Sequence, residues 1–316
     1  GTRFFFPGYS SDKTPADIWR WRSEKRPRAP WPSDVANPRR DHPPARVEGD
    51  GLRVSYIGHA SVLIQTHGLN LLIDPLWSER ASPFAFAGPK RVNAPGIVRD
   101  DLPQIDAILI THTHYDHLDI PTLRWLAQNR PARVLTPLGA DAIVRKAVPA
   151  LRAQGFDWGA RVELGAGCAI HVEPSYHWSA RGLSDRRMTL WASFVVETPA
   201  GAIYHIGDTG YHDGAIFRAA PATYGPIRLA IIPIGAYDPR WFMKDQHVDP
   251  EEAVRIFGDL GASWAMAHHW GAFRLTDEPI DEPPRRLAAA LDAAGIAPGR
   301  FVVRRPGEVF DVPTAI

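Results

Sequence analysis

The chain has 316 residues, of which 45% are apolar, so it can enclose a large hydrophobic core. Its formal net charge is only +1, and this balance argues against a nucleic-acid partner. The one cysteine, Cys168, excludes an intrachain disulfide and a cysteine-rich zinc site, and no apolar run reaches the roughly 18 residues that a membrane-spanning helix needs.

Residues 1–45 are rich in aromatic, basic and proline residues, and we expect an N-terminal extension that precedes one catalytic domain over 46–316. Thr14 and Pro15 are typical of a helix start, which predicts a short helix to about Lys25. Mixed aromatic and basic side chains suit an anionic lipid surface, so we expect peripheral membrane contact, in the cytoplasm or the periplasm. Packing of the aromatic residues along the catalytic domain is the alternative. The side chains concerned are Phe4, Phe5, Phe6, Trp19, Trp21, Trp31, Arg20, Arg22, Lys25, Arg26 and Arg28.

From residue 52 onward, β-rich and helical patterns alternate. The β-rich runs 52–66 and 69–75 flank a turn at His67-Gly68, and the apolar run 106–110 suits a buried strand. Helices are expected at 120–129, 141–155, 249–261 and 284–295, and strands at 132–139, 160–167, 169–178, 191–198, 202–210, 229–237, 264–271 and 301–310. This order predicts two mixed sheets packed together with helices outside, an α/β (α+β) architecture.

The segment 111–119 carries the strongest chemical signal. It places His112, His114, Asp116 and His117 directly after a buried strand. In extended backbone His112 and His114 project to the same side, and after a turn Asp116 and His117 can reach a second ion beside the first. Imidazole and carboxylate groups suit zinc, so we interpret the segment as a metal site rather than a histidine-rich surface loop.

Four neighbouring ligands cannot complete two metal sites. Three other strand ends offer the missing ones, namely His177, Asp208 and His269. Asp208 lies in Gly-Asp-Thr-Gly, where the glycines allow the backbone to approach closely.

The spacing from His112 to His117 is the signature of metallo-β-lactamase-fold hydrolases. Longer stretches resemble one branch of them, the N-acyl-phosphatidylethanolamine-hydrolysing phospholipase D group and its bacterial relatives. The stretch IPIGAYDPRWFMKDQHVDPEEAVRI is the most specific, and IGHASVLIQT, LNLLIDPLWSERASP, GPKRV, PSYHW, GDTGY and HWGAF support it. The resemblance covers roughly residues 50 to 295.

The resemblance implies a four-layer αββα sandwich with a dinuclear zinc site on one rim. It implies one ion bound by His112, His114 and His177 and another bound by Asp116, His117 and His269, with Asp208 bridging. His268 competes with His269, which is preferred because the family ligand directly precedes Trp-Gly. Iron or manganese in place of the two Zn²⁺ ions stays open.

Further residues are candidates for supporting or substrate-binding roles. Asp74 ends a strand and suits the carboxylate that orients a metal-bound histidine. His59 is expected near the metal pocket or as a hydrogen-bonded core residue. In the resembling branch Gln246 and His247 lie beside the substrate phosphate, and Tyr115 projects from the ligand loop towards substrate.

Two zinc ions would activate a bridging hydroxide, which Asp116 or Asp208 would orient. The favoured function is a phospholipase D-type phosphodiesterase acting on N-acyl-phosphatidylethanolamine-like phospholipids. Here Asp116, Asp208 and His247 are the expected catalytic residues, with His247 or Gln246 a donor to phosphate oxygen. The alternatives are a lactonase or carboxylic-ester hydrolase, and less favoured a nuclease or a non-catalytic metal-binding protein. The oligomeric state stays open, a homodimer included.

Overall fold

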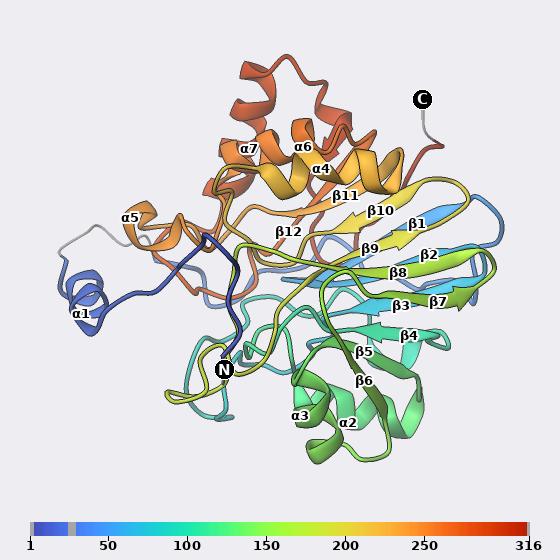
Figure 1. Ribbon diagram of the computed structural model, residues 1–316, viewed down its shortest axis with the longest axis horizontal. Helices are drawn as coiled ribbons and strands as arrows, with labels where there is room; N and C mark the ends of the chain where they lie inside the picture. Colours follow the sequence, from blue (N-terminus) through green and yellow to red (C-terminus); the bar gives the residue numbers. More distant parts are fainter. Residues whose placement is uncertain (1–2, 25–29, 315–316) are drawn as a thin grey trace.

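The computed structural model describes residues 3–24 and 30–314. Within them the chain folds into two seven-stranded sheets that lie face to face, with helices on both outer faces (Figure 1). The predicted four-layer αββα sandwich is therefore confirmed.

The first sheet has the order β14-β1-β2-β3-β4-β5-β6. Its strands β14, β1, β2 and β3 pair antiparallel, whereas β3 to β6 pair parallel. Their bounds are β1 Leu52–Gly58, β2 Ser61–Thr66, β3 Leu69–Ile73, β4 Ala107–Leu109, β5 Arg133–Pro137, β6 Arg152–Phe156 and β14 Val309–Asp311.

The second sheet has the order β13-β12-β11-β10-β9-β8-β7. Here β13 to β10 are parallel, and β10 to β7 are antiparallel. Their bounds are β7 Arg161–Gly165, β8 Cys168–Glu173, β9 Ser193–Glu197, β10 Ala202–His205, β11 Ile227–Pro233, β12 Trp264–His268 and β13 Phe301–Val302.

The helices form the outer layers. In Figure 1, α4 (Ala215–Tyr224), α6 (Pro250–Asp259) and α7 (Glu282–Ala293) cover the second sheet. Helices α2 (Ile120–Asn129) and α3 (Ala140–Ala147) cover the first, and α1 (Pro15–Ser23) and α5 (Arg240–Met243) lie at one end. The described residues also include two short 3₁₀ turns, Arg99–Asp101 and Pro298–Arg300.

Each sheet is covered on both faces, so both sets of alternating side chains along its central strands are apolar. On β11, Leu229 and Ile231 pack between the sheets, whereas Ala230 and Ile232 pack under the outer helices. On β2, Ile64 points to the inter-sheet core and Leu63 to the core beneath α2. A strand covered on both faces needs apolar residues at every position, as in these runs.

Two sequence-based expectations were wrong in detail. The helix expected over 141–155 ends at Ala147, before Pro149, and residues 152–156 form β6. The final strand expected over 301–310 is two strands, β13 and β14, in different sheets. The run 52–66 is β-rich as predicted, and it contains two strands, β1 and β2, on either side of His59. Helices α4 and α5 were not predicted.

The expected helix starts are confirmed by their hydrogen bonds. Thr14 caps α1 through a capping box with Asp17, and Asp249 caps α6 through one with Glu252. Helix α1 ends at Ser23, and Lys25, Arg26 and Arg28 lie outside the described residues. None of the helices in the described ranges has the length and apolar character needed to cross a membrane.

Candidate metal centre

The candidate ligands gather at one edge of the sandwich because strands of both sheets end there. His112 follows β4 in the first sheet, while Asp208 follows β10 and His269 follows β12 in the second. The carboxyl ends of parallel strands share an edge, where loops converge. His177, after β8, joins them from the antiparallel half. The site thus takes side chains from both sheets.

One group of imidazoles converges on a single point. His112 Nε2 lies 2.8 Å from His114 Nδ1, and His177 Nε2 lies 3.3 Å from the same atom. Ligands around a tetrahedral zinc ion with Zn–N distances of about 2.0–2.1 Å lie about 3.3 Å apart. These nitrogens therefore have the spacing of three ligands of one ion.

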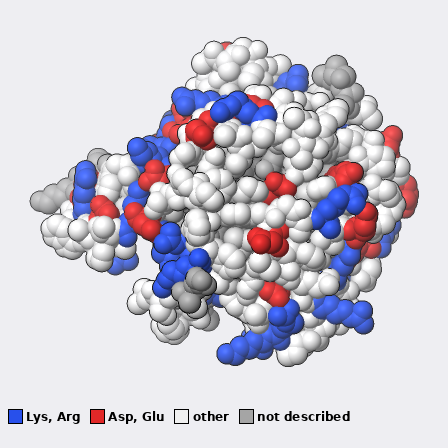
Figure 2. All heavy atoms as spheres, viewed as in Figure 1, with Lys and Arg blue, Asp and Glu red and all other residues white. Residues whose placement is uncertain are grey.

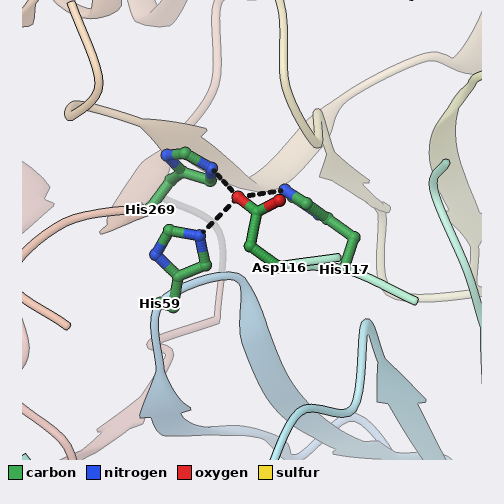
Figure 3. Close-up of side chains that lie close together, drawn as sticks. All are labelled: His59, Asp116, His117 and His269. Atoms are coloured by element: carbon green, nitrogen blue, oxygen red, sulfur yellow. Dashed lines mark hydrogen bonds and ion pairs between the residues drawn. The ribbon is translucent and has the colours of Figure 1, made fainter. Parts of the chain in front are cut away.

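A second group surrounds the carboxylate of Asp116 (Figure 3). Asp116 Oδ2 lies 2.9 Å from His59 Nε2, 3.4 Å from His269 Nε2 and 3.5 Å from His117 Nε2. The His59 ring lies 4.1 Å from that of His269, and the His59 carbonyl accepts the His269 amide at 2.8 Å. His59, expected only near the pocket, thus contacts two candidate ligands.

Asp208 lies between the two groups. Its Oδ2 lies 3.2 Å from His117 Nε2 and 3.7 Å from His177 Nε2, and its Oδ1 lies 3.2 Å from His269 Nε2. One carboxylate therefore faces nitrogens of both groups, which is the arrangement needed for a bridging ligand.

The polar atoms at this point fit metal ions rather than one another. Among the described residues, the buried atoms His117 Nε2, His269 Nε2 and Asp208 Oδ1 make no well-directed hydrogen bond, although Asp208 lies 3.2 Å from both imidazoles. Buried polar atoms rarely lack such a bond in proteins. Burial lowers the pKa of His114 to about 4 and holds the pKa values of His112 and His177 well below the ordinary range. Neutral imidazoles keep the lone pairs that a metal needs.

His117 and His269 differ because carboxylates surround them. Burial lowers the pKa of His269, but Asp208 and Asp116 outweigh it and raise the pKa to about 9. Burial opposes charge on His117 as well, yet Asp208, Asp116 and Asp74 hold its pKa well above the ordinary range. In the metal-free protein, protons on His269 and His117 thus supply the positive charge that a metal ion would supply beside these carboxylates.

Neighbouring groups orient the candidate ligands. Asp74 is fully buried and accepts hydrogen bonds from His117 Nδ1 at 2.7 Å and from the amide of Thr111 at 2.8 Å. His177 donates from Nδ1 to the Gln246 carbonyl at 3.0 Å. In both histidines Nε2 is left free to face an ion. The supporting role of Asp74 stays a prediction, and its hydrogen bond to His117 Nδ1 is the geometry that this role requires.

Strained backbone also gathers at this edge. His59, Asp74 and His269 have φ of 55°, 43° and 59°, in the left-handed region that residues other than glycine rarely occupy. Such conformations cost of order 1–3 kcal/mol each and cluster at functional sites. They turn the chain sharply at the strand ends and aim these side chains inward.

The expected substrate-binding residues lie at different distances from the centre. His247 Nδ1 lies 3.9 Å from Asp208 Oδ2, and burial lowers its pKa to about 4. The Gln246 side chain instead accepts from Trp178 Nε1 at 2.5 Å and contacts Met243. The Tyr115 ring is covered by the Arg181 guanidinium at 3.9 Å. Substrate contacts by these residues stay predictions.

The structure separates His268 from His269. The His268 ring lies 4.9 Å from that of His205, and neither residue belongs to a candidate metal group among the described residues. Sequence reasoning missed Trp178, whose ring lies 4.4 Å from His114, and Arg186, which stacks on Trp178 at 3.5 Å. Only the position of Trp178, next to His177, could have indicated it.

The sequence and the fold of this chain are similar to those of known proteins. Residues 69–270 match the family described as Beta-lactamase superfamily domain. An N-acyl-phosphatidylethanolamine-hydrolyzing phospholipase D 1 of Caenorhabditis elegans is 35% identical, with 83% of this chain and 76% of that protein aligned. An uncharacterized protein of Mycobacterium tuberculosis is 39% identical over 92% of this chain and 75% of its own length. An isothiocyanate hydrolase from Delia radicum gut bacteria, 20% identical, has the same fold, with a TM-score of 0.63 over 82% of this chain and 98% of that one.

Proposed function

The chain belongs to the metallo-β-lactamase superfamily of metal-dependent hydrolases, and from this premise we propose that it is a dinuclear phosphodiesterase that cleaves N-acyl-phosphatidylethanolamine-like phospholipids. The observation that carries the proposal is the position of Asp208, whose two oxygens face nitrogens of both histidine groups. The likeness to the nematode phospholipase D supports the substrate class.

The residues that would hold the ions follow from the two groups. His112, His114 and His177 would hold one ion, and Asp116, His117 and His269 the other, with Asp208 shared. Zinc suits this set of donors, and iron and manganese take the same ligand types. When bound, such ions supply positive charge and a water molecule of lowered pKa for hydrolysis.

The chain's own residues would orient the reaction. Asp116 is held by His59 through a 2.9 Å hydrogen bond, and with its carboxylate fixed in this way it would orient the attacking water. His247 is neutral at physiological pH because burial lowers its pKa to about 4. Its remaining N–H can donate to a phosphate oxygen, and this bond strengthens as negative charge develops. We assign to His247 the stabilisation of that oxygen.

Exposed apolar side chains on two loops that contact the ligand segment favour a lipid over a sugar. The loop after β3 carries Phe84 and Phe86, and Phe86 is 81% exposed. The loop after His177 carries Leu183 and Met188, both exposed. These loops contact the ligand segment, through Ser78 to Asp119 and through Arg181 to the carbonyl of Thr113, and Figure 1 shows both at the same end of the sheets.

The N-terminal aromatic residues divide into two sets. Phe6, Trp21 and Trp31 contact the rest of the fold, as in the packing alternative. Phe5 and Trp19 are 67% and 72% exposed and would add to the apolar loops at a membrane surface. On the face drawn in Figure 2, the described basic side chains are interspersed with acidic ones, which does not suit nucleic acid.

Metal analysis and a substrate screen test the proposal. The purified protein should contain close to two transition-metal equivalents and release phosphatidic acid from vesicles of N-acyl-phosphatidylethanolamine. It should also prefer this phospholipid to sugar lactones by kcat/KM. Efficient lactone opening without phosphodiester cleavage would show that the chain is a lactonase of the same fold.

Membrane contact needs its own test. A Phe84→Ser/Phe86→Ser variant should co-sediment less with anionic vesicles than the parent, whereas Arg161→Ala, at an exposed ion pair with Glu197, should not. Equal sedimentation of all three proteins would count against a lipid-facing rim.

A further inference from the structure

The N-terminal segment from Arg3 to Lys13 crosses the loops that carry His177 and His247, and we propose that it positions these two residues in the metal centre. The sequence suggested instead an extension preceding the catalytic domain. In Figure 1 the N-terminal trace runs upward towards α5 before it turns to α1. The inference rests on the proposed function, because it concerns the same site.

The Tyr9 hydroxyl ties together two backbone segments behind His177. It donates to the carbonyl oxygen of Tyr176 at 3.0 Å and also contacts the carbonyl oxygen of Asp245. Tyr176 directly precedes His177. Asp245 directly precedes Gln246, whose carbonyl accepts the Nδ1–H of His177 at 3.0 Å. One hydroxyl therefore fixes the relative position of the two segments that set the direction of the His177 ring.

An ion pair also restrains Asp245, on the loop that leads to His247. Lys13 Nζ lies 2.6 Å from Asp245 Oδ2, and the lysine side chain is only 16% exposed. The ammonium also lies 5.7 Å from the centre of the Phe242 ring. Asp245 begins the run that ends at His247, so this partly buried pair restrains the loop on which the proposed phosphate donor stands.

A second charged contact reaches the candidate ligand His114. Asp12 lies 3.3 Å from Arg186 Nε and 3.2 Å from Arg187 Nη2. Arg186 stacks on Trp178 at 3.5 Å, and Trp178 lies 4.4 Å from the His114 ring. The segment thus supports both loops that flank the first histidine group.

Apolar packing holds the segment in place. The Phe6 ring lies 5.0 Å from Tyr176 and 5.6 Å from Trp158. The Phe4 amide donates to the Arg187 carbonyl at 2.7 Å. Backbone, ring and charged contacts of the segment thus reach the 176–187 and 245–247 regions, which carry His177 and His247.

The test is a Tyr9→Phe/Lys13→Ala variant of the full chain, which keeps the Tyr9 ring and removes the hydroxyl and the ammonium. Hydrogen exchange of the metal-free protein should become faster in peptides covering 175–178 and 245–248. Zinc affinity, measured by chelator competition, should fall on the order of tenfold, which is near the lower end of the loss seen when a group that orients a metal ligand is removed. Tyr9→Phe/Lys13→Arg, which restores the ion pair, should recover part of both losses.

Matched controls separate positioning from general destabilisation. Tyr224→Phe removes a hydroxyl bonded to Glu173, and Arg161→Ala removes an exposed ion pair, so neither should alter exchange at 175–178. Parental exchange and parental zinc affinity in the double variant would overturn the inference. If the parent cleaves no phospholipid but the exchange difference appears, the substrate proposal fails and the positioning role stands.

Discussion

Replacement of Asp74 by asparagine is expected to weaken metal binding through His117, because the change reverses one hydrogen bond. Asp74 Oδ2 accepts from His117 Nδ1 at 2.7 Å and from the Thr111 hydroxyl at 2.6 Å, while Oδ1 accepts the Thr111 amide at 2.8 Å. Asparagine keeps one acceptor oxygen and places an NH₂ group at the other position. With the oxygen towards the Thr111 amide, the NH₂ group would donate to His117 Nδ1.

That reversal moves the His117 proton to Nε2, the atom that faces Asp116 and Asp208. Nε2 then has no lone pair for an ion. Loss of such a supporting carboxylate typically lowers metal affinity by about 10–100-fold. Loss of one hydrogen bond to a charged group costs about 1.5–3 kcal/mol of stability, and Asp74 is fully buried.

Two measurements on the same preparations would check these magnitudes. Urea unfolding of the metal-free proteins gives the stability change without a contribution from bound metal, and chelator competition gives the zinc affinity. Asp106→Asn is the control, because that carboxylate accepts the Asn70 amide at 2.7 Å and contacts Arg46, apart from His117. An Asp74→Asn protein that binds two zinc ions with parental affinity would refute the reasoning.

Three further outcomes are expected at the same centre. Asp208→Asn should reduce the metal content below two equivalents and abolish turnover, and near-normal turnover would place the bridge elsewhere. His247→Ala should keep both metals but lose phosphodiesterase turnover by about a hundredfold or more, since a lost oxyanion donor costs about 2.7–4 kcal/mol. The control is His171→Ala, which removes a ring bonded to Glu197. An equal loss of turnover in this control would argue against a specific role of His247. In the metal-free protein the raised His269 pKa, about 9, contributes stability that is complete below the ordinary value of about 6.5 and is lost as the pH rises through about 9. Thermal unfolding should therefore show a falling Tm across this window, and a smaller fall in His269→Gln; identical slopes would contradict the assignment.

Local signals predicted the elements whose ends are marked by particular residues. Helix α2 occupies Ile120–Asn129, as the pattern indicated, and Asp249 and Glu252 form the expected capping box of α6. Pro149 is a local signal that α3 ends before it, but the identity of the edge strand β6 comes from pairing with β5, which no local pattern reveals. The turn between β13 and β14 depends on Gly307, whose φ of 89° fits it against the backbone of Arg39.

In the candidate site, too, the residues that are close in sequence were predictable and the contacts between distant segments were not. His112, His114, Asp116 and His117 could be found because they lie within six residues, directly after a strand. The contact between His59 and Asp116 spans 57 residues, and that between Tyr9 and Asp245 spans 236. Such contacts depend on how two sheets and an N-terminal segment meet, so they required the folded structure.

Because the candidate ligands follow strands of both sheets, a destabilising substitution in the core is expected to affect metal binding. An ion held by both His117, after a strand of the first sheet, and Asp208, after a strand of the second, would link the two sheets. Its binding energy would then add to the energy that holds the sheets together. A cavity made far away, for example by Phe194→Ala in the inter-sheet core, would then first appear as metal loss rather than as unfolding. Excess zinc would mask such a lesion, and a chelator would expose it.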